Sequence, residues 1–397
     1  MLGWLLARAG VDVLVLERHQ DFLRDFRGDT IHPSTLDLMY ELGVLDEFLK
    51  RSHQKVYEIR AQVRNRMLTL GDFTHLPTHC KYLVLMPQWD FLNFVVEQAR
   101  KLPTFRVMMQ AEATDLIEKD GVIGGLYVKT TSGTIQVLAD LTVGSDGRHS
   151  IVRERAGLKV ENLGAPMDVL WMRISRRAGD PDQTFGHAEA GKIMILINRE
   201  SYWQCAFVIP KGEADEIRKH GLASFQRELA AMQPFLEDRV KELQDWSQVS
   251  LLTVTVDRLV RWFRPGLLCI GDAAHAMSPI GGVGINLAIQ DAVAAANILG
   301  PKLKDGTVTV LDLQAVQDRR TFPTVMTQRL QLAVQNRVIR RVLDSAKALD
   351  LPWILRLFEI FPMLRRLPAR VIGVGFRPEH VTSFMAKPGA QEIVRAA

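Results

Sequence analysis

Residues 267–291 constrain the fold of this chain more than any other stretch. Leu267–Ile270 is a short apolar run typical of a buried strand, and Asp272 stands where that strand would end. A glycine-rich loop follows, and the spacing of apolar residues from Ile285 onward is helical. Because glycine has no side chain and tolerates positive φ, the loop can bend sharply and approach a ligand closely. The glycines concerned are Gly281, Gly282 and Gly284.

The chemistry of the same stretch suits a flavin. An ionised Asp272 accepts hydrogen bonds from hydroxyl groups such as those of a ribityl chain, and unpaired N–H groups at a helix start favour an anion. Reduced flavin carries negative charge near N1 and the C2 oxygen, where amides around Gly284–Asn286 would stabilise it. A phosphate is disfavoured, because no Lys or Arg lies between Asp272 and Asp291. On spacing alone, a close-packed helix start with a capping Asp272 stays open as the alternative.

A family resemblance supports the flavin. The sequence Gly-Asp-Ala-Ala-His-Ala-Met-Ser-Pro-Ile-Gly-Gly-Val-Gly-Ile-Asn-Leu at residues 271–287 closely resembles the second flavin-binding motif of class A FAD-dependent aromatic hydroxylases. These include the para-hydroxybenzoate, phenol and polyketide hydroxylases. The resemblance implies that Asp272 holds the ribityl chain and that Pro279 lies near the ring edge. It also implies a flavin-facing segment that contains Gly281, Gly282, Gly284, Ile285 and Asn286.

The first 18 residues are typical of the second half of a dinucleotide-binding βαβ unit. Residues 1–9 predict a helix, and Val11–Leu16 predicts a buried parallel strand that ends at Glu17–Arg18. In such units an acid follows the glycine-rich turn by about 20 residues and binds a ribose hydroxyl. Counting back from Glu17 places that turn before Met1, so we expect an N-terminally truncated sequence without the first strand and Gly-x-Gly-x-x-Gly. We therefore expect the chain from Met1 to bind FAD weakly and to self-associate.

Further segments resemble other motifs of the family. Arg27 precedes a helix that begins at Pro33. In the family, an arginine at this distance before the helix contacts the FAD pyrophosphate region. Without the resemblance, Arg27 would be interpreted as a solvated arginine in a loop. Gln88 opens the next helix, and its family counterpart bonds the ribityl–phosphate region. Asp146 and Gly147 follow an apolar strand and resemble the third fingerprint, which serves FAD and the NAD(P)H pyrophosphate; alone they suggest a turn. The resemblance covers roughly the first 330 residues.

The patterns together predict an α/β fold with a Rossmann-like FAD-binding domain, an antiparallel substrate domain and C-terminal helices. We assign residues 1–75, 86–160 and 260–330 to the FAD-binding domain. Residues 76–85 and 161–259, where strand-like runs carry interleaved aromatic residues, are assigned to the substrate domain. Residues 331–397 predict a helical segment rich in arginine. Packing of that segment onto the FAD-binding domain is the simpler interpretation, and contact with an anionic membrane or a partner is the other.

Composition excludes several classes of function. The net charge of +5 is only mildly basic and the basic residues are dispersed before the C-terminal segment, so nucleic acid is not indicated. Cys80, Cys205 and Cys269 lie far apart and fit free thiols in a reducing cytoplasm. No apolar run reaches the roughly 18 residues that span a bilayer, and no signal peptide is visible. These features predict a cytoplasmic protein without stable membrane insertion, and they leave a homodimer open.

The resemblance implies an FAD-dependent monooxygenase. In the family, NADH or NADPH reduces the flavin, O₂ adds at C4a, and the hydroperoxide transfers one oxygen atom to a small aromatic or polyketide-like substrate. The protein positions the reactants and excludes water, so we assign no catalytic side chain and no metal. Two alternatives stay open because fold does not settle reaction: a reductase or oxidase of the same fold, and a truncated, non-catalytic descendant.

Overall fold

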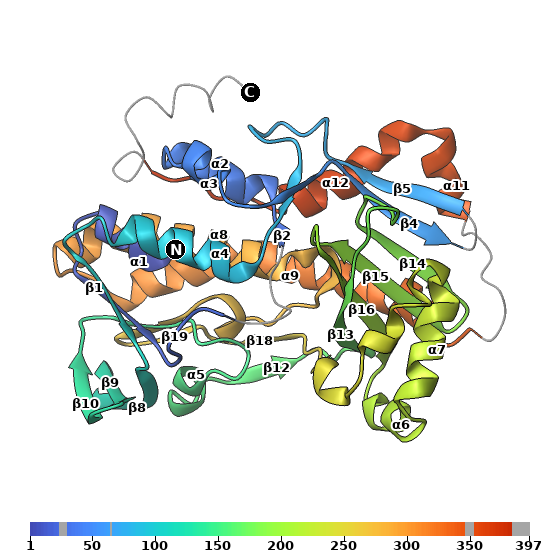
Figure 1. The fold of residues 1–397 in the computed structure, drawn as a ribbon. Helices are drawn as coiled ribbons and strands as arrows, with labels where there is room; N and C mark the ends of the chain where they lie inside the picture. The colour runs from blue at the N-terminus through green and yellow to red at the C-terminus, as the bar shows by residue number, and fades with distance from the viewer. Residues whose placement is uncertain (24–29, 64–65, 346–352, 383–397) are drawn as a thin grey trace.

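The computed structural model describes residues 1–23, 30–63, 66–345 and 353–382 of the chain. Helices and strands alternate along the sequence, and they form two lobes that lie side by side (Figure 1). The long helix α9 (Val310–Val334) extends from the first lobe, at the left of Figure 1, towards the second. The fold is α/β with parallel and antiparallel strand pairs, which confirms the predicted fold class.

Helices form the core of the first lobe. They are α1 (Leu2–Arg8), α2 (Pro33–Glu41), α3 (Leu45–Phe48), α4 (Gln88–Ala99), α5 (Ile151–Arg155) and α8 (Gly284–Lys304). Leu5, Phe94 and Val293, from α1, α4 and α8, are fully buried in one hydrophobic cluster. Two helix boundaries follow the sequence signals: Pro33 is the first residue of α2, and Gly10 follows α1 with φ +82°.

Short strands of the first lobe pair in small sheets. Their members are β1 (Val13–Glu17) with β7 (Phe105–Met109); β2 (Thr30–Ile31), β3 (Gln54–Val56) and β6 (Leu83–Leu85); β8 (Glu112–Lys119), β9 (Val122–Thr130) and β10 (Gly133–Leu138); β11 (Thr142–Gly144), β19 (Phe263–Arg264) and β20 (Leu267–Cys269); and β12 (Val160–Asn162) with β18 (Asp257–Leu259). The predicted parallel pairing of β1 is confirmed by β7, but the strand is half-buried throughout rather than buried. Strands β9 and β10 form a hairpin in which Thr130 pairs with Gly133.

A seven-stranded sheet forms the second lobe. In spatial order its strands are β17 (Ser250–Leu252), β13 (Met167–Ser175), β16 (Tyr202–Pro210), β15 (Lys192–Asn198), β14 (Phe185–Glu189), β4 (Glu58–Val63) and β5 (Arg66–Asp72). Helix α7 (Leu222–Met232) packs on it through Phe225 and Leu229, which join a buried cluster with Trp203. The short helix α6 (Ala214–Lys219) precedes α7.

The observed strand pairing differs from the predicted division into domains in two respects. Strands β4 and β5, which we assigned to the FAD-binding domain, extend the seven-stranded sheet, because β4 pairs in parallel with β14. Residues 76–85, assigned to the substrate domain, contribute β6, which pairs with β2 and β3 instead. Neither pairing has a local sequence signal.

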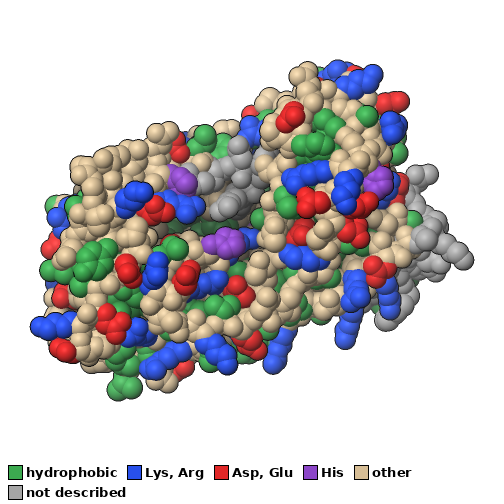
Figure 2. Space-filling view, turned by 90° about the horizontal axis from the view of Figure 1, so that it is seen from below, with side chains coloured by type: hydrophobic (Ala, Val, Ile, Leu, Met, Phe, Trp, Pro, Cys, Tyr) green, Lys and Arg blue, Asp and Glu red, His purple; other side chains and the backbone are tan. Residues whose placement is uncertain are grey.

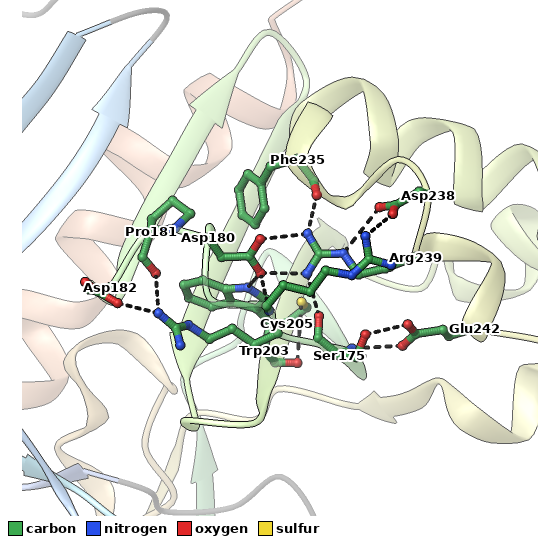
Figure 3. A network of polar contacts seen from close by, with 12 residues as sticks. Ser175, Asp180, Pro181, Asp182, Trp203, Cys205, Phe235, Asp238, Arg239 and Glu242 are labelled. Atoms are coloured by element: carbon green, nitrogen blue, oxygen red, sulfur yellow. Dashed lines mark hydrogen bonds and ion pairs between the residues drawn. The ribbon is translucent and has the colours of Figure 1, made fainter.

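A buried ion pair holds the loops at one end of the large sheet (Figure 3). The carboxylate of Asp180 accepts hydrogen bonds from the Arg239 guanidinium at 2.6 and 2.8 Å and from the Trp203 indole N–H at 2.9 Å. Arg239 also donates to the carbonyl of Ser175 at 2.8 Å and to that of Phe235. The network therefore joins the loop after β13 to the 3₁₀ turns that follow α7.

The C-terminal part is helical, as predicted. Helix α9 continues through a π-helical turn at Gln335–Ile339 into α10 (Arg340–Leu343), and α11 (Trp353–Ile360), a 3₁₀ turn (Pro362–Arg365) and α12 (Arg366–Gly373) follow. The last two helices lie over β4 and β5, at the upper right of Figure 1, rather than over the first lobe alone.

Within the described ranges, one helical stretch, Ile280–Lys304, is long and apolar enough to cross a membrane by length and composition. Its most apolar window is 61% buried, and its inward residues include Val293 and Ala295, which are fully covered. This stretch therefore forms the core of the first lobe. The three cysteines are buried free thiols, as expected.

Candidate functional site

The glycine motif folds as the sequence predicts. Strand β20 ends at Cys269, a 3₁₀ turn spans Gly271–Ala273, and α8 begins at Gly284. Gly271 has φ +59°, and a Cβ there would lie 2.9 Å from the Cβ of Ala288. The end of the strand can approach α8 this closely only with glycine at that position.

A second close approach occurs at the double glycine. Gly281 and Gly282 have φ +77° and +62°, and a Cβ at Gly282 would lie 2.8 Å from Oγ1 of Thr30. Pro279 is half-buried at the start of this turn, and its carbonyl accepts the N–H of Gly282 at 3.1 Å. The turn therefore fixes β2 against the loop that leads into α8.

The start of α8 presents unpaired backbone donors beside an acid. Among the described residues no side chain caps the helix, and the N–H of Leu287 is bonded to the carbonyl of Val283 at 2.9 Å. The amides of Gly284, Ile285 and Asn286 precede that first helical bond and belong to the orphan donors of a helix N-terminus. A Cβ at Gly284 would lie 4.0 Å from Oδ1 of Asp272, so this carboxylate adjoins the helix start.

Asp272 is accessible to a ligand. Its side chain is 32% exposed, and within the described residues its ion-pair partner is Arg148, whose Nη2 lies 3.6 Å from Oδ2. That distance is too long for a direct hydrogen bond. The carboxylate oxygens thus keep acceptor capacity for hydroxyl groups.

The Asn286 side chain acts as a clamp within the protein. Its Oδ1 accepts hydrogen bonds from the His32 amide at 2.9 Å and from Thr35 Oγ1 at 2.8 Å. Its Nδ2 donates to the carbonyls of Thr30 at 2.8 Å and Gly282 at 3.1 Å. The expected flavin contact of Asn286 is therefore left to its backbone amide, and the side chain joins residues 30–35 to the glycine loop.

The third fingerprint is held by its own hydrogen bonds. The carboxylate of Asp146 accepts from Ser150 Oγ at 2.5 Å and from the Val152 amide at 3.2 Å, so it fixes the start of α5. Gly147 has φ +88°, and a Cβ there would meet no atom within 4 Å. Asp146 thus fixes the turn that begins α5, while the backbone at Gly147 is open to a ligand.

Arg153, which was not among the predicted cofactor-binding residues, connects the third fingerprint to the glycine motif. Its guanidinium donates to the carbonyls of Arg148 and, at 3.4 Å, of Ala273. It also forms an ion pair of 3.5 Å with the buried Asp257. Arg153 therefore sets the position of Arg148 relative to the Asp272 turn.

The remaining predicted residues lie in the first lobe. Glu17 ends β1, and its Oε1 accepts the His19 amide at 2.9 Å. Arg18 is exposed, and its Nε donates to Nε2 of His19 at 2.8 Å. Gln88 is half-buried as the first residue of α4, directly after the N-cap residue Pro87. Arg27 lies outside the described residues.

Three glutamines also support the site. Gln328, Gln331 and Gln335, at helical spacing on α9 and its π-helical continuation, are buried and bond to the loop that precedes α8. Gln331 donates to the carbonyls of Ser278 and Ile280 at 2.9 and 3.0 Å and accepts the Ser278 amide at 3.1 Å. The signal in the sequence was the spacing of three glutamines on one helix face.

A buried charge network fixes the Gly271 turn from the other side. Asp291 Oδ2 accepts the Gly271 amide at 3.0 Å and lies 2.6 Å from His275 Nε2, while Oδ1 accepts Arg320 Nε at 2.9 Å. Arg320 also pairs with Glu379 at 3.1 Å. Burial raises the pKa of Asp291, but His275 and Arg320 outweigh it and hold that pKa below its ordinary value. His275 is therefore a structural histidine.

These features fit FAD. The uncapped start of α8 matches the anionic pyrimidine of a reduced flavin, and the accessible carboxylate of Asp272 matches a ribityl chain. At Gly271 and Gly282 the backbone of the loop packs directly against neighbouring residues, because neither position carries a side chain. Seen from below, the surface between the two lobes is hollowed, with Lys, Arg and His side chains beside the hollow (Figure 2).

Comparison with known proteins gives several matches. Residues 1–330 match a family model described as FAD binding domain. The 6-methylpretetramide 4-monooxygenase of Streptomyces rimosus is 33% identical over 340 residues, which cover 85% of this chain and 81% of that protein. The OxyS anhydrotetracycline hydroxylase of Streptomyces rimosus superposes with a TM-score of 0.72 at 20% identity, covering 94% of this chain and 72% of that one.

Another solved structure, PqsL of Pseudomonas aeruginosa in complex with 2-aminobenzoylacetate, also has a TM-score of 0.72. Its identity is 20%, and the match covers 86% of this chain and 93% of that one. At such identities, both structural matches establish the fold.

Proposed function

We propose that this chain, which belongs to the FAD-binding family of monooxygenases matched over residues 1–330, hydroxylates a polycyclic aromatic, polyketide-like substrate. FAD is the cofactor of the family, and NADH or NADPH and O₂ are the co-substrates. The observation that carries the proposal is the 33% identity to a 6-methylpretetramide 4-monooxygenase over 340 residues, which cover 85% of this chain.

The residues of the glycine motif would bind and orient the cofactor. Asp272 would accept hydrogen bonds from the ribityl hydroxyls, and the amides of Gly284, Ile285 and Asn286 would face the pyrimidine. When bound, FAD supplies the redox chemistry that activates O₂ for transfer of one oxygen atom. The protein stabilises developing negative charge with amide dipoles that are already oriented, so no reorganisation is needed.

The large sheet would provide the apolar wall for the substrate. On one face of it, Val169, Ala206 and Val208 form a buried cluster, and Ile280, from the loop just before α8, packs against that cluster. This contact brings the sheet face to the glycine loop. An apolar wall beside the flavin motif favours an aromatic substrate and excludes water from the reacting atoms.

The test is an assay of coupled turnover. FAD-loaded protein would be screened with polycyclic phenols for substrate-stimulated oxidation of NADH and NADPH, and the product would be analysed by mass spectrometry after reaction in isotopically labelled O₂. We expect one labelled oxygen atom per product molecule. A reductase would form product without the label, and an oxidase would release peroxide with no labelled product, so either result would contradict the proposal.

A matched pair of variants assigns the reaction to this site. Asp272→Ala should reduce turnover at limiting FAD, whereas Asp305→Ala, at the far end of α8, should not. Equal turnover of both variants at limiting FAD would place the cofactor elsewhere.

A further inference from the structure

The surface of the C-terminal helices carries a concentrated apolar ridge. We propose that this ridge, residues 360–370, docks the protein onto an anionic membrane surface. Five large apolar side chains within eight residues are exposed: Ile360 by 65%, Phe361 by 56%, Met363 by 71%, Leu364 by 40% and Leu367 by 67%. Single exposed apolar residues are common on soluble proteins, but a contiguous group marks an interaction surface.

The ridge is rigidly attached to the protein. On the inner side of α12, Ala369 is fully buried, and a Cβ at Gly373 would lie 2.8 Å from Leu76 and 3.2 Å from Phe73. The same helix directs Leu367 and Arg370 outward. Leu367 is therefore exposed on the outer face of an amphipathic helix that is packed on its other face, while the other four ridge side chains lie in residues 360–364, at the end of α11 and in the turn that leads into α12.

The charge beside the ridge is positive. Arg365, Arg366 and Arg370 lie in residues 360–376, and this stretch has no Asp or Glu. The nearest preceding acid, Glu359, forms an ion pair of 3.1 Å with Arg66. Around α12, Arg366 faces His75 at 3.4 Å, and His75 in turn lies 3.7 Å from Asp72. Arg370 is exposed.

Apolar side chains next to arginines suit an anionic lipid surface. The apolar groups insert at the boundary of headgroups and acyl chains, while the arginines remain at the level of the lipid phosphates. The ridge lies at an outer corner of the molecule in Figure 1, which a flat bilayer surface can reach. Helix α12, which carries the end of the ridge, also adjoins the candidate site, because Ile372 would lie 3.8 Å from a Cβ at Gly281.

The experiment is co-sedimentation of the FAD-bound protein with phosphatidylcholine vesicles, with and without phosphatidylglycerol. We expect binding only when phosphatidylglycerol is present, with a loss at high salt because salt screens the arginines. The double variant Met363→Ser/Leu367→Ser should lower the partition coefficient about tenfold or more. Arg370→Gln should lower it about fivefold.

Two control variants match the exposure of the ridge residues. Leu138→Ser and Leu311→Ser change leucines that are 73% and 75% exposed on other elements, and vesicle binding should not change. The melting temperature and FAD absorbance of each variant report on folding. Absence of wild-type binding to phosphatidylglycerol vesicles would overturn the proposal, as would equal losses in ridge and control variants. Conversion of a dimer to a monomer by the double variant, with vesicle binding unchanged, would assign the ridge to a second copy instead.

Discussion

Replacement of Asp180 by Asn tests the buried ion pair of the second lobe. The side chains of Asp180 and Arg239 are 6% and 3% exposed, and four donated hydrogen bonds converge on the carboxylate, two of them from Arg239. Asp180→Asn leaves a buried guanidinium without its counter-charge. Breaking a buried pair in this way costs about 3–5 kcal/mol. Because Asn retains one acceptor, we expect about 3 kcal/mol.

The same carboxylate makes stability depend on pH. Burial opposes ionisation of Asp180, but hydrogen bonds from Arg239 and Trp203, then the Arg177 amide and the charge of Arg239, lower its pKa from 3.8 to about 2. A carboxyl group whose pKa is lower in the folded state stabilises the fold above its unfolded pKa. That contribution is lost as the pH falls from about 4 towards 2. We expect it to be about 1–2 kcal/mol, since solvent screens a network that reaches the surface.

The assay is urea unfolding of both proteins between pH 7 and pH 3, followed by tryptophan fluorescence. At pH 7 the free energy of unfolding of the variant should be about 3 kcal/mol lower than that of the wild type. This difference between the two proteins should become smaller as the pH falls. Asp182→Asn is the matched control, because Asp182 pairs with Arg176 at 2.5 Å but is 90% exposed. Its cost should stay below about 1 kcal/mol. Equal costs for the two variants, or a gap independent of pH, would refute the reasoning.

Further predictions concern the flavin motif and its support. Asp272→Ala should weaken FAD binding about ten- to a hundredfold in a fluorescence titration, since hydrogen bonds to a charged acceptor are lost. Gly284→Val should lower the reduction potential of bound FAD, whereas Gly284→Ala should not, because a Cβ there meets nothing closer than 3.8 Å. Gly266→Ala should destabilise by about 3 kcal/mol or more, since its Cβ would lie 2.0 Å from the Ile123 carbonyl oxygen. Gly306→Ala, at φ +65° in open space, should cost only about 1 kcal/mol in the same denaturation assay.

Local chemistry in the sequence was enough to predict the centre of the first lobe. Apolar runs, a proline at a helix start and glycines at turns depend on neighbouring residues alone, so they specify β20, the Gly271 turn and the start of α8. The same reasoning gave the helix that begins at Pro33. Asp272 and the amides that follow Val283 could be chosen because their chemistry shows in one continuous stretch.

Only the tertiary structure decided which distant residues hold that stretch in place. Asn286 bonds to the backbone of His32, and Arg320 connects Asp291 to Glu379, across separations that no local pattern encodes. The sequence also did not predict the pairing of β4 with β14. A strand can extend the edge of either sheet, and the choice depends on which sheet its side chains pack against in the folded protein. Steric limits on the backbone act between neighbours in the chain, whereas burial and charge pairing are settled only when remote segments meet.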